Sequence, residues 1–207
     1  MKKKIYSILV VGSVLAACAL GVDEYNEWRH DEMSEKPYTH TRAQFVRKAL
    51  SNAEPIDTLV LGDSISEMTW LVDVCGKTYN ASAAGAKIGD VALLAPLAIQ
   101  RTRPKVIVLE VGTNNLWTDP TPSDDFKRQY LALVHSLPGR KILVGIPNSP
   151  AASDFVRNVA SHVHAAYVEP VTGELTQSGG VHPTPEGAVV YRQRSQQACV
   201  SRTSPVS

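Results

Sequence analysis

Short apolar runs alternate with longer amphipathic stretches along most of this chain. Continuous apolar runs typical of buried strands occupy residues 58–61, 105–111 and 141–146, and shorter candidates lie at 77–79 and 165–168. Helical patterns cover residues 42–51, 91–99, 123–136, 155–163 and 185–199. Strands that are apolar throughout and alternate with helices are typical of a parallel sheet buried on both faces. The pattern predicts an α/β protein, a three-layer α/β/α sandwich around a five-stranded parallel sheet.

Polar residues follow two of these strands and precede the last helix. Ser64 follows the strand at 58–61, Asn114 follows the one at 105–111, and His182 stands just before the helix that Thr184 caps. Sites on such sheets lie beyond the carboxyl ends of the strands. A hydroxyl, an amide donor and an imidazole are the parts of an acyl-transfer site. The order therefore predicts a serine hydrolase, with Ser64 as nucleophile and His182 as base.

The same residues predict an oxyanion hole. The Asn114 amide and the backbone N–H groups of Ser64 and Gly85 are the candidate donors, Gly85 by its position on the loop after the second strand. Two plainer interpretations stand beside this one: Ser64 as a helix N-cap, and Asn114 and Gly85 as ordinary turn residues. Trp70 and Trp117 are candidates to line the acyl pocket or to stack on sugar, and the plainer interpretation is half-buried packing.

His182 is the one histidine framed by turn residues, on a loop where functional side chains concentrate. We interpret the others, His30, His40, His135, His162 and His164, as surface or packing residues. Their context gives no metal-ligand spacing, so neither metal nor cofactor is expected. A net charge of +1, from 21 basic and 20 acidic side chains, gives no broad field for nucleic acid.

The first residues predict export and membrane attachment. Residues 1–22 read as a leader, with Lys2 to Lys4 before an apolar stretch and Leu15-Ala16-Ala17-Cys18 similar to a bacterial lipobox that would be lipidated on Cys18. The alternative is an uncleaved N-terminal membrane helix. A charged tether at 23–38 and one domain at 39–207 follow. Both alternatives place the domain outside the cytoplasm, anchored to a membrane in the bacterial periplasm or at the cell surface.

Two cysteines, Cys75 and Cys199, remain in the predicted domain. In an oxidising compartment such an even pair is compatible with a disulfide. Two separate buried thiols are the alternative, because bridging depends on a Cα separation below about 7 Å.

These motifs resemble the SGNH or GDSL hydrolase family over residues 58–186. The Ser, Gly, Asn and His that name the family map onto Ser64, Gly85, Asn114 and His182. The resemblance implies a flavodoxin-like sheet and an ester-cleaving site with a Ser nucleophile, a His base and three oxyanion donors. Residues 80–82 and the short chain resemble the bacterial thioesterase and lysophospholipase group, while small extracytoplasmic relatives often remove acetyl groups from glycans. Ile65 replaces the Leu of the GDSL name, a volume-conserving change.

One departure from the family pattern affects the chemistry. The family usually carries Asp three residues before the His, and this chain has Gly179 there. A carboxylate at that place fixes the tautomer of the imidazole and stabilises the imidazolium. A backbone carbonyl near Gly179, or Glu169 or Glu174, is the candidate substitute.

The sequence thus predicts a membrane-tethered extracytoplasmic esterase that forms an acyl-enzyme on Ser64. Because no long insertion is available as a lid, we expect a small, acetyl-type acyl group on a soluble alcohol or an acylated glycan. Two alternatives stay open: an acyltransferase that modifies envelope polysaccharide, and a non-catalytic binding or assembly protein that keeps the fold.

Overall fold

The computed structural model describes residues 37–51, 54–69, 71–178 and 180–200. The chain divides into two units, residues 1–40 and 41–207, and the described part of the first is the start of helix α2 (Pro37–Leu50). The predicted leader, Cys18, Trp70 and Gly179 lie outside the described residues. Among the helices that are described, none has the length and apolar character needed to span a membrane.

Five parallel strands form the sheet, in the order β2-β1-β3-β4-β5. Their bounds are β1 (Thr58–Gly62), β2 (Thr78–Asn80), β3 (Val106–Glu110), β4 (Arg140–Val144) and β5 (Ala166–Val168). The register places Leu59 beside Ile107 and Gly62 beside Glu110. This strand order is that of flavodoxin-like sheets. The predicted parallel five-stranded sheet is confirmed.

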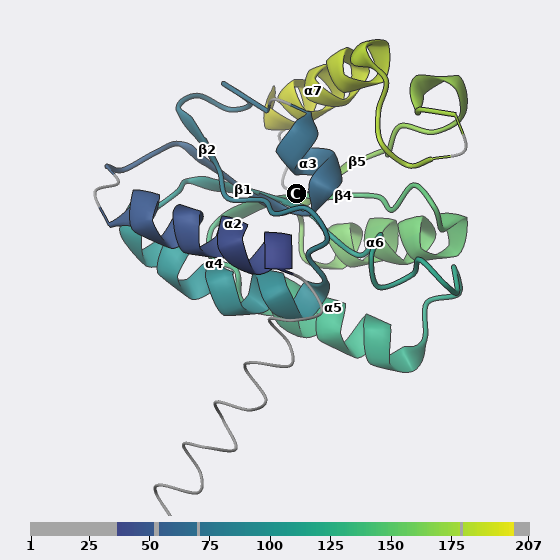
Figure 1. Ribbon diagram of the computed structural model, residues 1–207, viewed down its shortest axis with the longest axis horizontal. Coiled ribbons are helices and arrows are strands. Elements are labelled where there is room, and N and C mark those ends of the chain that lie inside the picture. The colour runs from purple at the N-terminus through teal and green to yellow at the C-terminus, as the bar shows by residue number, and fades with distance from the viewer. Residues whose placement is uncertain (1–36, 52–53, 70, 179, 201–207) are drawn as a thin grey trace, which may run out of the picture. The chain divides into compact units, whose positions relative to one another are not determined.

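Helices cover both faces of the sheet, as Figure 1 shows. They are α3 (Ser64–Met68), α4 (Ile88–Thr102), α5 (Asp124–Ser136), α6 (Pro150–His162) and α7 (Pro185–Val200), besides α2 and a 3₁₀ turn, η1 (Gly173–Leu175). Leu59 and Leu61 of β1 join a core with α2, α4, α5 and α6. Val60 joins a second core with α3 and α7. Alternate side chains of a strand point to opposite faces, so the fold is the predicted three-layer sandwich.

Capping residues set where two of the helices begin. Thr184 Oγ1 accepts a hydrogen bond from Gly187 N at 3.1 Å, which confirms it as the N-cap of α7. Helix α6 begins at Pro150, five residues before the predicted start, and Ser149 Oγ caps it by accepting from Ala152 N at 3.1 Å. Proline favours the first helical position, where its missing N–H costs nothing.

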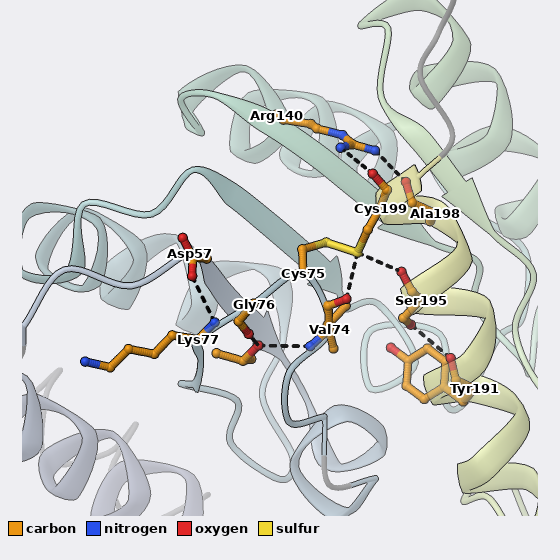
Figure 2. The surroundings of a disulfide bond; sticks show 11 residues. Asp57, Val74, Cys75, Gly76, Lys77, Arg140, Tyr191, Ser195, Ala198 and Cys199 are labelled. Atoms are coloured by element: carbon orange, nitrogen blue, oxygen red, sulfur yellow. Dashed lines mark hydrogen bonds between the residues drawn. A yellow bond between two sulfur atoms is a disulfide. The ribbon is translucent and has the colours of Figure 1, made fainter.

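A disulfide joins Cys75, between α3 and β2, to Cys199 in the last turn of α7 (Figure 2). Their Cα atoms lie 5.6 Å apart. The Arg140 guanidinium donates to the carbonyl oxygens of Cys199 and Ala198 at 2.7 and 2.6 Å, which satisfies the end of the same helix. Of the two alternatives for these cysteines, the bridge is the one the structure contains.

Candidate active site

The turn from β1 into α3 presents Ser64 at the carboxyl edge of the sheet. A side chain at Gly62 would put its Cβ 2.5 Å from Glu110 O, so the close approach of β1 and β3 requires glycine there. Asp63 is the N-cap of α3, since its Oδ1 accepts from Ile65 N at 3.0 Å. Ser64 is therefore the first helical residue, and its interpretation as an N-cap is wrong.

The Ser64 hydroxyl and the His182 imidazole meet directly. Ser64 Oγ lies 2.8 Å from His182 Nε2, although the two residues are 118 positions apart. The backbone of His182 is held on its loop, because its carbonyl oxygen accepts from Gln177 N at 2.8 Å and the next residue, Pro183, bridges to Thr176. Ser64 is buried and His182 is half-buried. The geometry is that of a nucleophile within reach of its base.

The other imidazole nitrogen, Nδ1 of His182, has no hydrogen-bond partner among the described residues. Glu169 bonds Arg157 and the Tyr167 hydroxyl, and it makes no hydrogen bond to His182 in the described structure. Glu174 is exposed on η1 and makes no hydrogen bond to His182 in the described structure. The described part of the chain thus supplies a Ser–His pair and no carboxylate behind it.

Asn114 and Gly85 lie on two loops that contact each other. Asn114 Nδ2 donates to Ala86 O at 3.1 Å. Residues 83–86 form a turn closed by Ala86 N to Ala83 O at 3.0 Å, with Gly85 third at a φ of +79°. That φ lies in the left-handed region that type II turns require of their third residue. An amide carries two N–H donors, so the contact with Ala86 uses one of them.

Side-chain amides brace the loop that carries Asn114. Asn148 Nδ2 donates to Thr113 O and Leu116 O, each at 3.2 Å. Asn115 Oδ1 accepts from Ile88 N at 3.0 Å, at the start of α4. The loop is thereby tied to the segment after β4 and to α4.

Glu67, which the sequence analysis did not single out, joins the Ser64 helix to the Gly85 turn. Its Oε2 accepts from Ala84 N at 2.6 Å, and its Oε1 lies 3.0 Å from Arg42 Nε. Arg42 also donates to Ser82 O at 3.2 Å. The only sequence signal is an acidic residue one turn after Ser64, which many helices carry in their first turn for the macrodipole alone.

A second unpredicted feature is a pair of carboxyl groups beneath Ser64. Asp63 and Glu110 are both 0% exposed and contact each other. Glu110 Oε2 accepts from Ser66 N and Ser66 Oγ at 3.2 and 3.1 Å. Burial raises the pKa of both carboxyls, and the negative charge of Asp63 raises the pKa of Glu110 further. The available signal was a glutamate inside an otherwise apolar strand.

The remaining candidates take no part in this cluster. Trp117 is 62% exposed, so half-buried packing does not describe it. His162 bonds the carbonyl oxygen of Asn158 through Nδ1, within its own helix. Across the described ranges, no three His, Cys, Asp or Glu side chains gather as a metal site would require.

Fold and geometry together define a class: a flavodoxin-like α/β/α sandwich with a Ser–His pair at the carboxyl edge of its sheet. Solved structures similar to this chain include those of esterases and acylhydrolases. No protein-family model and no curated protein matches the sequence.

Three similar structures illustrate the fold. TesA is 19% identical with a TM-score of 0.56, over 69% of this chain and 97% of that one. A GDSL-like lipase from Bacteroides thetaiotaomicron is 16% identical with a TM-score of 0.63, over 77% and 97%. A catalytic mutant of an acetylxylan esterase from Geobacillus stearothermophilus is 15% identical with a TM-score of 0.56, over 72% and 96%. The resemblance to the SGNH or GDSL hydrolases is thus confirmed at the level of the fold.

Proposed function

We propose that this protein is a serine esterase that cleaves small acyl esters through an acyl-enzyme on Ser64. The observation that carries the proposal is the 2.8 Å contact between Ser64 Oγ and His182 Nε2 at the carboxyl edge of the sheet. An isolated hydroxyl is a weak nucleophile, and an imidazole at this distance accepts its proton as attack proceeds. The fold, shared with esterases, supports the same reaction.

The reaction proceeds in two balanced steps. Ser64 Oγ bonds to the ester carbonyl carbon while its proton passes to His182 Nε2; the alcohol then leaves with that proton, and an acyl-enzyme remains. Water attacks the acyl carbon, gives its proton to Nε2, and the carboxylic acid leaves as Ser64 regains its hydrogen. The oxyanion of each step would be stabilised by Asn114 Nδ2 and the N–H groups of Ser64 and Gly85.

The proposed substrate is an acetyl-type ester, carried on a soluble alcohol or a glycan. One similar structure belongs to an acetylxylan esterase, which supports this class. The exposed Trp117, three residues after Asn114, offers an indole face on which a sugar ring could stack.

We place the protein outside the cytoplasm, held to a membrane through its N-terminus. The lipobox-like Leu15 to Cys18 supports a lipid anchor. The Cys75–Cys199 disulfide supports an oxidising compartment, because such bonds are rare where glutathione keeps thiols reduced.

Labelling with a fluorophosphonate tests the activated hydroxyl. Ser64 Oγ bonds to phosphorus, fluoride leaves, and His182 takes the proton. We expect a single modified residue, Ser64, and no label after Ser64→Ala or after His182→Ala. A folded wild-type protein that stays unlabelled would favour the non-catalytic alternative, a binding protein that keeps the fold.

An acyltransferase would use the same acyl-enzyme and differ only in its acceptor. Adding an oligosaccharide to the assay distinguishes the two. An esterase releases the same free acid with or without the sugar, whereas a transferase diverts the acyl group to a sugar hydroxyl.

A further inference from the structure

We propose that Asp63 and Glu110 share one proton, and that this singly charged pair is a positioning device for the Ser64–His182 site. The inference rests on the proposed function for its catalytic consequence and on the buried geometry for the pair itself. Neither carboxyl touches the reacting atoms in the mechanism above. Both are positioning residues.

The geometry leaves two carboxyl oxygens without a well-formed hydrogen bond. Asp63 Oδ1 accepts from Ile65 N, and Glu110 Oε2 accepts from Ser66. The other oxygens, Asp63 Oδ2 and Glu110 Oε1, are buried and make no hydrogen bond of normal geometry within the described residues. The buried Thr113 hydroxyl, which has no other partner there, acts on Asp63 and lowers the pKa of that carboxyl, but it does not act on Glu110. Since the two side chains contact each other, a proton held between them satisfies both oxygens at once.

The proton belongs on Glu110. No basic side chain of the described residues acts on either carboxyl, so two negative charges here would repel without relief. The contact between them favours ionisation of Asp63 and disfavours that of Glu110. Tyr191 on α7 and Tyr130 on α5 are the other titratable groups that act on Glu110, and burial raises the pKa of both phenols, which keeps them neutral.

The pair connects three of the four segments that carry candidate site residues, those of Ser64, Asn114 and His182. Glu110 ends β3, four residues before Asn114, and bonds Ser66, two residues after Ser64. Ser66 Oγ lies 3.2 Å from the hydroxyl of Tyr191, on the helix that follows His182. Every group in this series of hydrogen bonds is buried, so water would not weaken the effect of an added charge or a lost acceptor. One proton thereby sets the relative positions of the nucleophile and base segments.

A cavity beside the pair supplies a competing explanation. Ile65, Val144, Val181 and Tyr191 line it together with Glu110. A water there would let Glu110 ionise and would replace the shared proton as the partner of Oε1. The two explanations differ in how stability depends on pH.

The test compares wild type with Glu110→Gln, whose amide N–H donates to Asp63 as the carboxyl O–H does but does not titrate. A group with a raised native pKa holds its proton in the folded state after the unfolded state has released it. Its contribution to stability is therefore complete below the unfolded pKa and is lost as pH rises towards the native one. Within that window the unfolding equilibrium constant of wild type should increase by about tenfold per pH unit relative to E110Q.

Denaturant unfolding from pH 5 to pH 9 measures this ratio, with exposed Glu54→Gln as the matched control that should follow wild type. An infrared band of a protonated carboxyl group, present in wild type at neutral pH and lost in E110Q, is a second readout. Parallel pH profiles for wild type and E110Q, or an absent band, would overturn the shared proton.

The positioning role has its own readout. Glu110→Ala should lower kcat for an aryl acetate at least tenfold while KM changes little, and E110Q should restore most of that loss. A Gln variant as slow as the Ala variant would contradict positioning by a single neutral donor. If neither wild type nor any variant hydrolyses an ester, the proposed function fails. The unfolding and infrared results still show whether Asp63 and Glu110 share one proton.

Discussion

Glu67 Oε2 accepts a hydrogen bond from the backbone N–H of Ala84 at 2.6 Å, which ties the helix that begins at Ser64 to the turn that carries Gly85. Arg42 pairs with the other oxygen of the same carboxylate at 3.0 Å. The turn therefore has a defined distance from Ser64 before any substrate binds. An oxyanion donor acts only where it is held in place in advance.

We predict that Glu67→Ala lowers kcat by about ten- to a hundredfold with little change in KM, less than the loss expected on removing an oxyanion donor outright. Glu67→Gln should be milder, because its amide oxygen still accepts from Ala84 N. Steady-state hydrolysis of an aryl acetate measures both. Exposed Glu54→Ala is the control, and equal kcat values in E67A and wild type would show that the turn does not need this contact.

Gly179 stands where the SGNH or GDSL resemblance implies an Asp, and Nδ1 of His182 lacks a partner among the described residues. A carboxylate there would hold the Nδ1–H tautomer and stabilise the imidazolium. Gly179→Asp should therefore raise kcat by about tenfold or more. Gly179→Asn, which is similar in size but uncharged, should gain less. If G179D gives no gain, the imidazole already has an adequate orienting group.

The Cys75–Cys199 bridge closes a loop across most of the domain, with a sequence separation of 124. Replacing both cysteines with Ser should reduce the free energy of unfolding by about 2–5 kcal/mol, because the unfolded chain regains its freedom. Denaturant unfolding of the double variant and of oxidised wild type measures the difference. Reductant should shift wild type towards the variant and leave the variant unchanged. No difference between the two proteins would mean that packing alone holds α7.

The membrane attachment that we propose depends on whether Cys18 is lipidated. If it is lipidated, Cys18→Ala should abolish incorporation of labelled fatty acid and alter processing of the leader. Gel mobility and fatty-acid labelling of the full chain in a bacterial host are the measurements. Equal mobility and no label in wild type would instead favour the uncleaved helix, the alternative that the apolar run through Val22 left open.

The fold was accessible from sequence because its strands are short, apolar and separated by helices. The apolar run at Val106–Glu110 and the Thr184 cap of α7 are local signals. In natural sequences such local preferences agree with the fold, so they can be recognised without it. The pairing of Ser64 with His182 was also predictable, since carboxyl ends of parallel strands gather at one edge.

The supporting contacts were not accessible in the same way. Asp63 meets Glu110 only because β1 lies beside β3 with Gly62 opposite Glu110, and that register is a property of the assembled sheet. The Glu67–Ala84 bond depends on how α3 is oriented, which no periodicity encodes. Alternating polarity says which face a residue occupies and leaves open which partner it finds there.

Hydrolysis of an aryl acetate by residues 37–207, with Ser64→Ala beside wild type, tests the central claim most directly. The account predicts that wild type releases the phenol through an initial burst, as an acyl-enzyme requires, and that S64A is inactive while its circular dichroism matches wild type. Equal rates in the two folded proteins would contradict the assignment of Ser64 as the nucleophile.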